Sequence, residues 1–332
     1  MKKKNILILY GGEGREHDVS AQGAKFLLSV IDRTRYNPIP ILITRSGLWR
    51  TPWRKYLTVH PERRGNRGIL RTNDGEIPID CAFPLLHGDC GEDGKIQGAL
   101  DTLRIPYVGC TPTAGGICSD KILTKAIAES LGIKVAHSIY SLGESLEVAK
   151  FRAESFIGYP MFIKPSNLGS SVGCARALLP EDFARAFSAA ARESKRILIE
   201  EYLEGAREIE CAYLGTRTRG EIFTHPGEVI VGDVYTYEKK YSKNSDARIL
   251  SRAPLDDDTV TRVKNHARRL VRAIGIRHLA RIDFFLYEGE IIFNEINTMP
   301  GFTGASLYPR MLESAGVPPR ELVTELIEEA MC

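Results

Sequence analysis

Residues 280–297 read Ala280-Arg-Ile-Asp-Phe-Phe-Leu-Tyr-Glu-Gly-Glu-Ile-Ile-Phe-Asn-Glu-Ile-Asn297 and predict a β-hairpin. Strands over 279–286 and 290–297 flank a turn, which we centre on Gly289. Counting outward from Gly289 places Asp283 opposite Glu295, and Arg281 opposite Asn297. Because side chains alternate between the two faces of a strand, these four share one face. The other face takes Ile282, Phe284, Asn294 and Ile296.

This hairpin face suggests a metal site. Two carboxylates directly opposite each other repel, so Asp283 and Glu295 need compensation. With Asn297 they supply the hard oxygen ligands that suit Mg²⁺, which keeps coordination positions for phosphate and water. Arg281 adds a positive fork for a phosphate or a developing oxyanion. The alternative is a solvated hairpin face with one salt bridge, and the hairpin alone leaves both interpretations open.

A glycine loop follows the apolar strand predicted at 161–164. It reads Lys164-Pro-Ser-Asn-Leu-Gly-Ser-Ser-Val-Gly173, with Gly169 and Gly173 on either side of two serines. Small residues let backbone N–H groups approach phosphate oxygens, and hydroxyls add donors. The spacing matches neither a P-loop nor the dinucleotide-binding fingerprint. Taken alone, the loop is therefore also consistent with a simple turn.

Carboxylates end the strand predicted at 197–202, where the chain reads Ile199-Glu-Glu-Tyr-Leu203, with Glu208 further on. They suit the amino group of adenine and the hydroxyls of ribose, or they form an ordinary acidic surface. Two N-terminal loops, 11–20 and 87–94, each follow an apolar strand, at 5–10 and 81–86. The carboxyl ends of parallel strands meet at one edge, so we expect both loops there. His17 and His87 lack metal-ligand spacing.

Composition restricts the class of protein. The chain has 332 residues, which suggests two or three domains, with 43% apolar and 26% charged residues. A net charge of +3 gives no electrostatic footprint for nucleic acid. No apolar run reaches the roughly 20 residues of a membrane helix. We therefore expect no membrane partner. Seven cysteines without a C-x-x-C pair favour reduced thiols, so we expect a cytoplasmic protein.

The order of elements predicts an α/β protein, α+β in part, whose N-terminal domain holds a parallel sheet. Ser20 is predicted to cap the first helix, and 44–79 to form hairpin and loop. A later helix carries the apolar stripe Ile122, Leu123, Ala126, Ile127 and Leu131. Further predicted elements are strands near 38–43, 207–214 and 227–231, helices at 180–192 and 256–274, and a helix around 322–327.

Taken in order, these motifs resemble the D-alanine–D-alanine ligase family of the ATP-grasp superfamily. The resemblance covers nearly the whole chain. It rests on Gly11–Ser20, His87–Gly94, Ser119–Lys121, Lys164–Gly173, Glu200, Arg207–Glu208, Lys240–Tyr241, Arg281–Asp283 and Asn294–Gly301. The resemblance implies a three-domain ATP-grasp architecture, with ATP between the second and third domains. The implied domains are an N-terminal substrate-binding domain (1–118), a central subdomain (119–203) and a C-terminal subdomain (204–332) with a mobile loop at 235–248.

The resemblance also implies roles for single residues. The ATP-binding set would be Lys121, Lys164, Ser171, Glu200, Glu201, Leu203, Glu208 and Lys240. Asp283, Glu295 and Asn297 would hold two Mg²⁺ ions, for which Mn²⁺ could substitute. The catalytic set would be Glu16, Ser170, Tyr241, Arg281, Gly301 and Ser306, with His87 and Leu307 at the substrate subsites.

The implied reaction is phosphoryl transfer followed by acyl transfer, which supplies peptidoglycan precursors. ATP phosphorylates the carboxylate of one D-alanine, the amine of a second D-alanine attacks, and phosphate leaves. Cations must neutralise the γ-phosphate, and a closed site must keep water from the acyl phosphate. The family implies a homodimer through the N-terminal region, which an exposed apolar patch there would support.

Two alternatives stay open. The loop Glu238–Asp246 and Tyr308-Pro-Arg-Met311 have forms shared with ligases of vancomycin resistance, so the second substrate could be D-serine. Ser306-Leu307 and the form of the loop 164–173 instead favour D-alanine, and Tyr241 argues against a dedicated D-lactate ligase. The other alternative is a catalytically silent nucleotide-binding protein of the ATP-grasp fold. The intact lysines and metal-ligand candidates argue against it.

Overall fold

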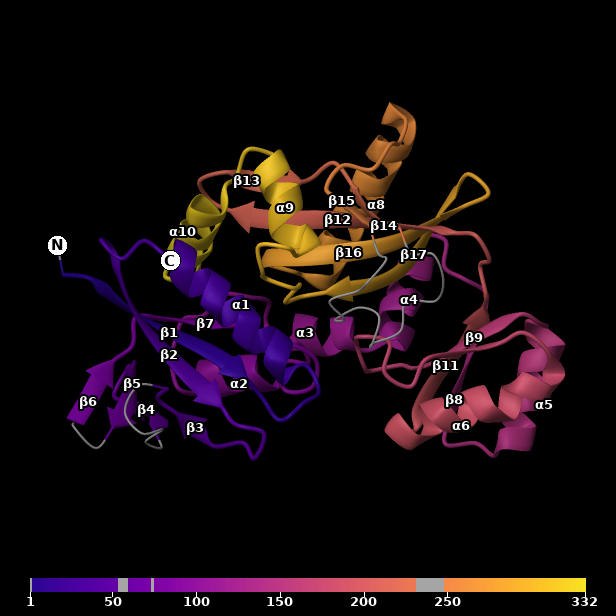
Figure 1. The fold of residues 1–332 in the computed structure, drawn as a ribbon, viewed down its shortest axis with the longest axis horizontal. Helices are drawn as coiled ribbons and strands as arrows, with labels where there is room; N and C mark the ends of the chain where they lie inside the picture. Colours follow the sequence, from indigo (N-terminus) through magenta and orange to yellow (C-terminus); the bar gives the residue numbers. More distant parts are fainter. Residues whose placement is uncertain (1, 53–58, 73–74, 231–247) are drawn as a thin grey trace.

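The computed structural model describes residues 2–52, 59–72, 75–230 and 248–332. It is a mixed α/β protein in which three larger sheets follow one another along the chain, and one small sheet is formed by a stretch inserted within the first (Figure 1). The predicted fold class is therefore confirmed. No helix among the described residues is both long enough and apolar enough to cross a membrane.

The N-terminal sheet carries the two glycine-containing loops. Strand β1 pairs in parallel with β2 on one side and with β7 on the other, as predicted. The order is β3-β2-β1-β7, with β1 (Lys4–Gly11), β2 (Tyr36–Ile43), β3 (Trp49–Arg50) and β7 (Cys81–Pro84). Its helices are α1 (His17–Val30) and α2 (Lys95–Thr102). The stretch 44–79 also forms a small antiparallel sheet of β4 (His60–Arg64), β5 (Arg67–Thr72) and β6 (Gly75–Pro78).

The predicted start of the first helix was wrong. Helix α1 begins at His17, three residues before Ser20, and Ser20 is fully buried within it. The Ser20 hydroxyl accepts a hydrogen bond from the Gly11 N–H at 2.7 Å and donates to the Leu85 carbonyl at 2.5 Å. This side chain thus joins the ends of β1 and β7 instead of capping a helix. A short hydroxyl can bond whichever backbone groups lie beside it, not only those at a helix start.

The central sheet is antiparallel and has the order β10-β9-β11-β8. Its strands are β8 (Ser138–Leu142), β9 (Met161–Pro165), β10 (Ala175–Ala177) and β11 (Arg196–Glu201). Helices pack beside it (Figure 1): α5 (Leu146–Phe156) and α6 (Phe183–Glu193), the latter preceded by the short η1 (Pro180–Asp182). Two further helices, α3 (Pro112–Ser119) and α4 (Lys121–Ser130), lead from the first sheet to this one.

The third sheet has the order β15-β14-β12-β16-β17, with β13 beside β12. Its strands are β12 (Arg207–Thr216), β13 (Gly220–Phe223), β14 (Gly227–Ile230), β15 (Arg248–Leu250), β16 (His278–Tyr287) and β17 (Glu290–Asn297). Its helices are α8 (Asp257–Ile274), α9 (Leu307–Ser314) and α10 (Pro319–Ala330). The predicted apolar faces of α8 and α10 are buried, from Val260 to Ile274 and from Leu322 to Ile327.

The hairpin register is confirmed at the predicted site, although the turn was misplaced. Tyr287 pairs with Glu290, so the turn is the two residues Glu288 and Gly289, both with positive φ, at 49° and 77°. A β-bulge at Asn294 then inserts one extra residue into β17. The insertion restores the predicted pairs, Asp283 with Glu295 and Arg281 with Asn297.

The buried face of α4 also differs from the prediction. The helix forms as expected, but Leu123 is 44% exposed and Ala126 is exposed. The buried positions are Lys121, Thr124, Lys125 and Ala128. Apolar periodicity fails here because the two lysines face carboxylates in the interior, as described below.

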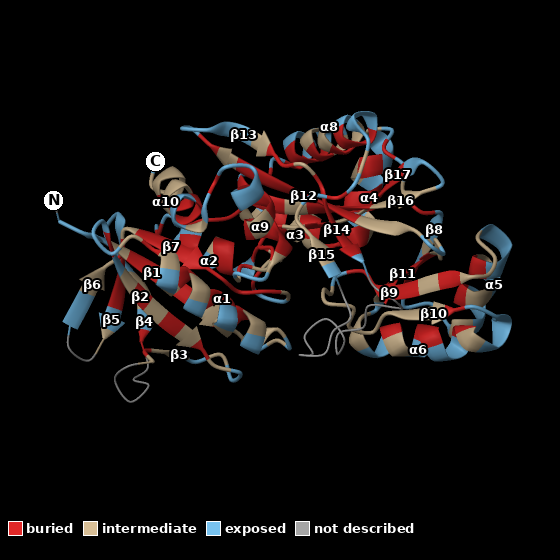
Figure 2. Ribbon diagram, turned by 45° about the horizontal axis from the view of Figure 1, so that its top comes forward, coloured by how far each residue is buried: buried red, intermediate tan, exposed pale blue. Residues whose placement is uncertain are grey.

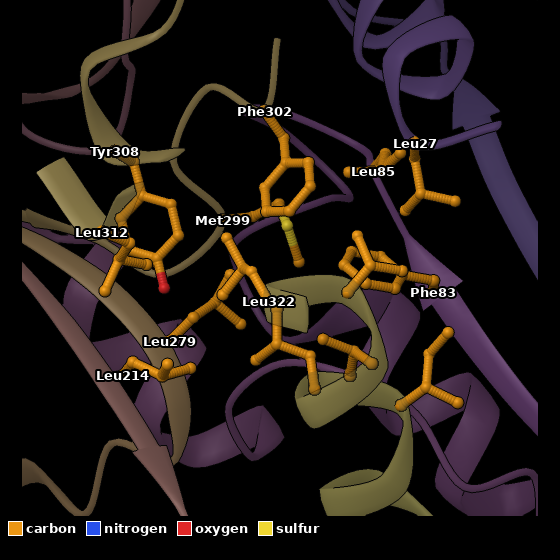
Figure 3. Close-up of a cluster of buried hydrophobic side chains, with 14 of the residues drawn as sticks. Leu27, Phe83, Leu85, Leu214, Leu279, Met299, Phe302, Tyr308, Leu312 and Leu322 are labelled. Atoms are coloured by element: carbon orange, nitrogen blue, oxygen red, sulfur yellow. The ribbon is translucent and has the colours of Figure 1, made fainter. Parts of the chain in front are cut away.

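One hydrophobic cluster joins the first and last parts of the chain. Figure 3 shows Leu27, Phe83 and Leu85 from the N-terminal sheet and its helix facing Phe302, Tyr308 and Leu322 from the C-terminal segment. In Figure 2 the buried residues run through this junction, whereas the outer faces of the helices are exposed. The turn 298–306 therefore rests on both regions.

Candidate active site

Three carboxylates form a row across the third sheet. Glu210 on β12 lies opposite Asp283 on β16, which in turn lies opposite Glu295 on β17. Sequence reasoning found the last two and missed Glu210, although Glu210 follows Glu208 by two residues and must share its face. Such a row is self-repelling unless cations compensate it.

Arg281 compensates one end of the row. Its guanidinium donates to both oxygens of Asp283, at 2.8 and 2.7 Å, and lies 2.9 Å from Oε2 of Glu210. Burial alone would lower the pKa of Arg281, but Asp283 and Glu210 outweigh it and raise that pKa well above its ordinary value. Asn297 donates its amide to Asp283 at 2.9 Å. The four predicted residues of the hairpin face are thus together.

Two lysines reach the other end of the row. Lys121, at the start of α4, lies 3.0 Å from Oε2 of Glu295, and its Nζ donates to the Leu168 carbonyl at 2.8 Å. Lys164 on β9 donates to Oδ1 of Asn294 at 3.1 Å. The prediction that Asn294 belongs to the opposite face, with Phe284, was wrong, because the bulge turns Asn294 toward Lys164.

Glu200 on β11 is enclosed between two lysines. Its Oε1 lies 2.5 Å from Nζ of Lys164, and its Oε2 lies 3.1 Å from Nζ of Lys125. Burial would raise the pKa of Glu200, but the two lysines outweigh it and hold that pKa below its ordinary value. A carboxylate oxygen can accept more than one hydrogen bond, and an adenine amino group is the kind of donor that suits Glu200.

The glycine loop contacts the N-terminal region. The Ser170 hydroxyl donates to Oε1 of Glu16, which joins two residues predicted to act together. Ser170 and Ser171 both have positive φ, at 52° and 58°, a conformation unfavourable for non-glycine residues. Backbone strain of this kind is concentrated at functional sites. A second link joins Arg15 to Glu193 of α6 at 2.9 Å.

The turn after β17 is held by the loop 87–94. Nδ1 of His87 lies 3.0 Å from the Met299 carbonyl oxygen. The Met299 N–H donates to Glu92 at 3.2 Å, and the Gly88 N–H donates to the other oxygen of Glu92 at 2.9 Å. Burial, with the charge of Glu16 second, raises the pKa of Glu92 to about 7. These contacts fix the peptide two residues before Gly301.

Ser306 stands at the N-terminus of α9, immediately before Leu307. Its hydroxyl accepts from the Thr303 N–H at 3.1 Å and lies 2.8 Å from the Thr303 hydroxyl. A Cβ at Gly301 would lie 3.1 Å from this hydroxyl, so the turn at Gly301 and the helix start are adjacent. Unpaired N–H groups at a helix start attract a carboxylate.

The structure does not bring all of the remaining predicted residues to the same place. Glu208 shares its sheet face with Glu210, but Glu201 turns its carboxylate to the His137 N–H at 2.9 Å. Leu203 and Ser171 are half-buried. Lys240 and Tyr241, with most of the predicted mobile loop 235–248, lie outside the described residues.

The oxygen ligands and cations of this site fit Mg²⁺ and a nucleoside triphosphate. Two carboxylates and an amide offer hard oxygens, and lysines with an arginine surround them. Among the described residues, no group of three or more His, Cys, Asp or Glu forms a metal centre alone. The fit therefore includes the Asn297 amide and leaves ligand positions for phosphate.

Sequence comparison supports this interpretation over the whole chain. Two family models match, "D-ala D-ala ligase N-terminus" at residues 5–110 and "D-ala D-ala ligase C-terminus" at 127–328. A D-alanine–D-alanine ligase of Thermoanaerobacter sp. (strain X514) is 37% identical, covering 100% of this chain and 97% of the relative. One from Caldicellulosiruptor bescii is 38% identical, covering 100% and 96%.

Solved structures agree. D-alanyl-alanine synthetase A from Vibrio cholerae superposes with a TM-score of 0.90 at 31% identity, covering 100% of this chain and 99% of that one. The VanG D-Ala:D-Ser ligase from Enterococcus faecalis gives 0.88 at 30% identity, covering 99% and 100%. The fold and the site define an ATP-grasp ligase. The chain belongs to the D-alanine–D-alanine ligase family.

Proposed function

We propose that the protein joins two D-alanines to D-alanyl-D-alanine with ATP, through an acyl phosphate, for peptidoglycan precursors. The observation that carries this proposal is the row Glu210, Asp283 and Glu295, bordered by Arg281 and Lys121. Such a row places negative ligands for metal beside positive groups for phosphate. Phosphoryl transfer needs both, because charge on the transferred group must be neutralised.

The nucleotide would lie between β9, β11 and β17. Lys121 and Lys164 face the transferred phosphates, and the loop 166–173 covers them with backbone N–H groups and serine hydroxyls. Glu200, Glu201 and Leu203 surround the adenine, Glu208 binds the ribose, and Ser171 and Lys240 complete the set. Two Mg²⁺ ions held by Asp283, Glu295 and Asn297 would neutralise charge on the transferred phosphoryl group. Mn²⁺ has the same preference for oxygen ligands.

The amino acids would lie at the junction of the loops. Glu16, oriented by Ser170, binds the ammonium of the first D-alanine, and His87 lies beside that site. The family resemblance assigns Tyr241 to the same catalytic group. Arg281 and the Gly301 N–H stabilise the oxyanion that forms when the second amine attacks. Ser306 and Leu307, at the start of α9, receive the carboxylate of the second D-alanine.

The three-domain division at 118 and 203 is part of this proposal. Its support is that each proposed range contains a larger sheet of its own. A cytoplasmic location is also proposed, because all seven cysteines are free thiols among the described residues. The homodimer stays a prediction. Leu48 is the one exposed large hydrophobic side chain between residues 2 and 118 outside the gaps at 53–58 and 73–74, so no apolar patch supports a dimer there.

The test is ADP release measured with purified protein, ATP and Mg²⁺, with and without D-alanine. The proposal expects release that requires both Mg²⁺ and D-alanine. Nucleotide binding without D-alanine-dependent release would contradict the proposal and favour a catalytically silent binder.

A further inference from the structure

Glu200 has two lysine partners from different elements, and only one of them lies beside the glycine loop. Lys164 is the second-last residue of β9, just before that loop, and contacts Oε1 of Glu200 at 2.5 Å. Lys125 belongs to α4 and lies 3.1 Å from Oε2. The three side chains are each at least 94% buried. The arrangement is therefore an enclosed pair of cations around one carboxylate.

Lys125 is set back from the predicted phosphate position. It follows Lys121 by four residues on the same face of α4, one turn or about 6 Å farther from the helix start. Lys121 reaches the glycine loop through the Leu168 carbonyl. Lys125 instead donates to the Phe293 carbonyl of β17 at 3.4 Å. The contacts of Lys125 are thus the Phe293 carbonyl and Glu200, and neither belongs to the glycine loop.

Lys164 cannot give its full charge to a phosphate while it alone neutralises Glu200. A buried carboxylate without a counter-ion is strongly unfavourable, so Glu200 would compete with the nucleotide for Lys164. Because Lys125 occupies the second oxygen, Glu200 keeps a partner when Lys164 turns toward a ligand. Asn294, a neutral acceptor, is the other partner of Lys164 and adds no competing charge.

We propose that Lys125 is a positioning residue: it is the permanent counter-ion of Glu200 and so leaves Lys164 free to bind the phosphates of the nucleotide. The proposal rests on the proposed function, since it assumes that ATP is the ligand of this cleft. It assigns a task to a lysine that does not itself contact the phosphate. It also explains why α4 buries Lys125 while Leu123 and Ala126 are exposed.

Charge states agree with this geometry. Burial lowers the pKa of Lys125 from its ordinary value, and the charge of Glu200 opposes that change. Burial would raise the pKa of Glu200, yet the two lysines keep it below its ordinary value. The carboxylate that needs a permanent partner is therefore ionised near neutral pH.

The first experiment measures ATP affinity by titration calorimetry with Mg²⁺ and without D-alanine. Lys125→Met removes the charge but keeps the length of the side chain. We expect its Kd for ATP to rise about tenfold or more, the scale of one charge-assisted hydrogen bond. Lys125→Arg keeps the charge, so its Kd should rise less than that of Lys125→Met. Lys125→Gln serves as the second neutral variant if the methionine variant does not fold.

The matched control is Lys134→Met. Lys134 is an exposed lysine paired with Glu290 at 3.1 Å, outside the cleft, so its loss should leave the Kd for ATP unchanged. Melting temperatures of all variants show whether a change in affinity accompanies a loss of fold.

The decisive arm adds Glu200→Gln to Lys125→Met. A neutral glutamine in place of Glu200 no longer competes for Lys164, so the double variant should bind ATP at least about threefold tighter than Lys125→Met alone. A purely structural role for Lys125 predicts instead that the two losses add. An additive result, or a neutral Lys125 variant with wild-type affinity, overturns the inference alone. A wild-type protein that binds no ATP overturns the proposed function and the inference with it.

Discussion

Asp283 lies directly opposite Glu295 across the ladder of β16 and β17, and the bulge at Asn294 makes this pairing possible. Without the extra residue, the two-residue turn at 288–289 would place Asn294 opposite Asp283. Both carboxylates would then no longer face each other, because a shift of one residue sends a side chain to the other face. The bulge therefore sets the spacing of the proposed metal ligands.

Replacement of one of these carboxylates tests the metal site. We expect Glu295→Gln to lower kcat at least about a hundredfold, because it removes a metal ligand and the partner of Lys121. The check is ADP release over a range of Mg²⁺ concentrations. The control is Glu290→Gln, at the exposed start of the same strand. Wild-type Mg²⁺ dependence in the Glu295 variant would exclude Glu295 as a ligand.

Arg281 provides the second prediction. One donor to a developing oxyanion contributes roughly 2.7–4 kcal/mol to the transition state, so Arg281→Ala should lower turnover at least about a hundredfold. Initial rates with saturating ATP and D-alanine measure this. Arg272→Ala removes an exposed arginine paired with Glu221 and should act like wild type. Near-normal turnover of Arg281→Ala would remove Arg281 from the mechanism.

The contact between Ser170 and Glu16 provides the third. Ser170→Ala removes the hydroxyl that orients the Glu16 carboxylate, so the KM for D-alanine should rise about tenfold. Glu16→Gln should raise it further, and the double variant should be no worse than Glu16→Gln alone. The measurement is the KM for D-alanine of each variant, from steady-state kinetics at varied D-alanine concentration. Additive increases of KM in the double variant would mean that the two side chains act separately.

The fourth prediction concerns pH. Nδ1 of His278 accepts the Gly109 N–H at 3.0 Å, and burial lowers the pKa of His278 to about 4. The folded protein keeps this imidazole neutral down to about pH 4, whereas the unfolded chain binds a proton below about 6.5. The free energy of unfolding should therefore fall as pH falls from 6.5 toward 4, by about 1–2 kcal/mol between pH 6.5 and 5.

Urea unfolding at several pH values measures this slope. His278→Gln should flatten it, because glutamine accepts the same hydrogen bond without titrating in this range. His60→Gln, at an exposed histidine, should leave the slope as it is in wild type. A wild-type slope in the His278 variant would mean that another group causes the loss of stability.

Local patterns predicted much of the fold and the hairpin half of the site. Apolar side chains recur at a fixed spacing where one face of a strand or helix is buried. For this reason the sequence predicted β1, β2, α8 and the hairpin β16–β17. The register of Asp283 with Glu295 was predicted correctly only because the misplaced turn and the unforeseen bulge offset each other. A bulge has no marker in the alternation of side chains, so Asn294 was assigned to the wrong face.

Long-range charge pairing explains what sequence missed. Lys125 is buried on α4 because Glu200, 75 residues later, faces it. Apolar periodicity favoured Leu123 instead, since it ignores partners distant in the chain. Two spacings in the sequence could have identified the missed residues. Lys125 follows Lys121 by four residues and so shares its helix face, and Glu210 follows Glu208 by two residues and so shares its strand face. Ser20 was misread because its partner is also distant in the chain: its hydroxyl donates to the carbonyl of Leu85, just after β7.

Product analysis in competition shows directly which second substrate the protein uses. Purified protein receives ATP, Mg²⁺ and equal concentrations of D-alanine and D-serine near neutral pH, and mass spectrometry quantifies the dipeptides. We predict D-alanyl-D-alanine as the main product, with ADP formed in equal amount. D-alanyl-D-serine as the main product, or ADP formed without dipeptide, would contradict the proposed D-alanine–D-alanine ligase activity.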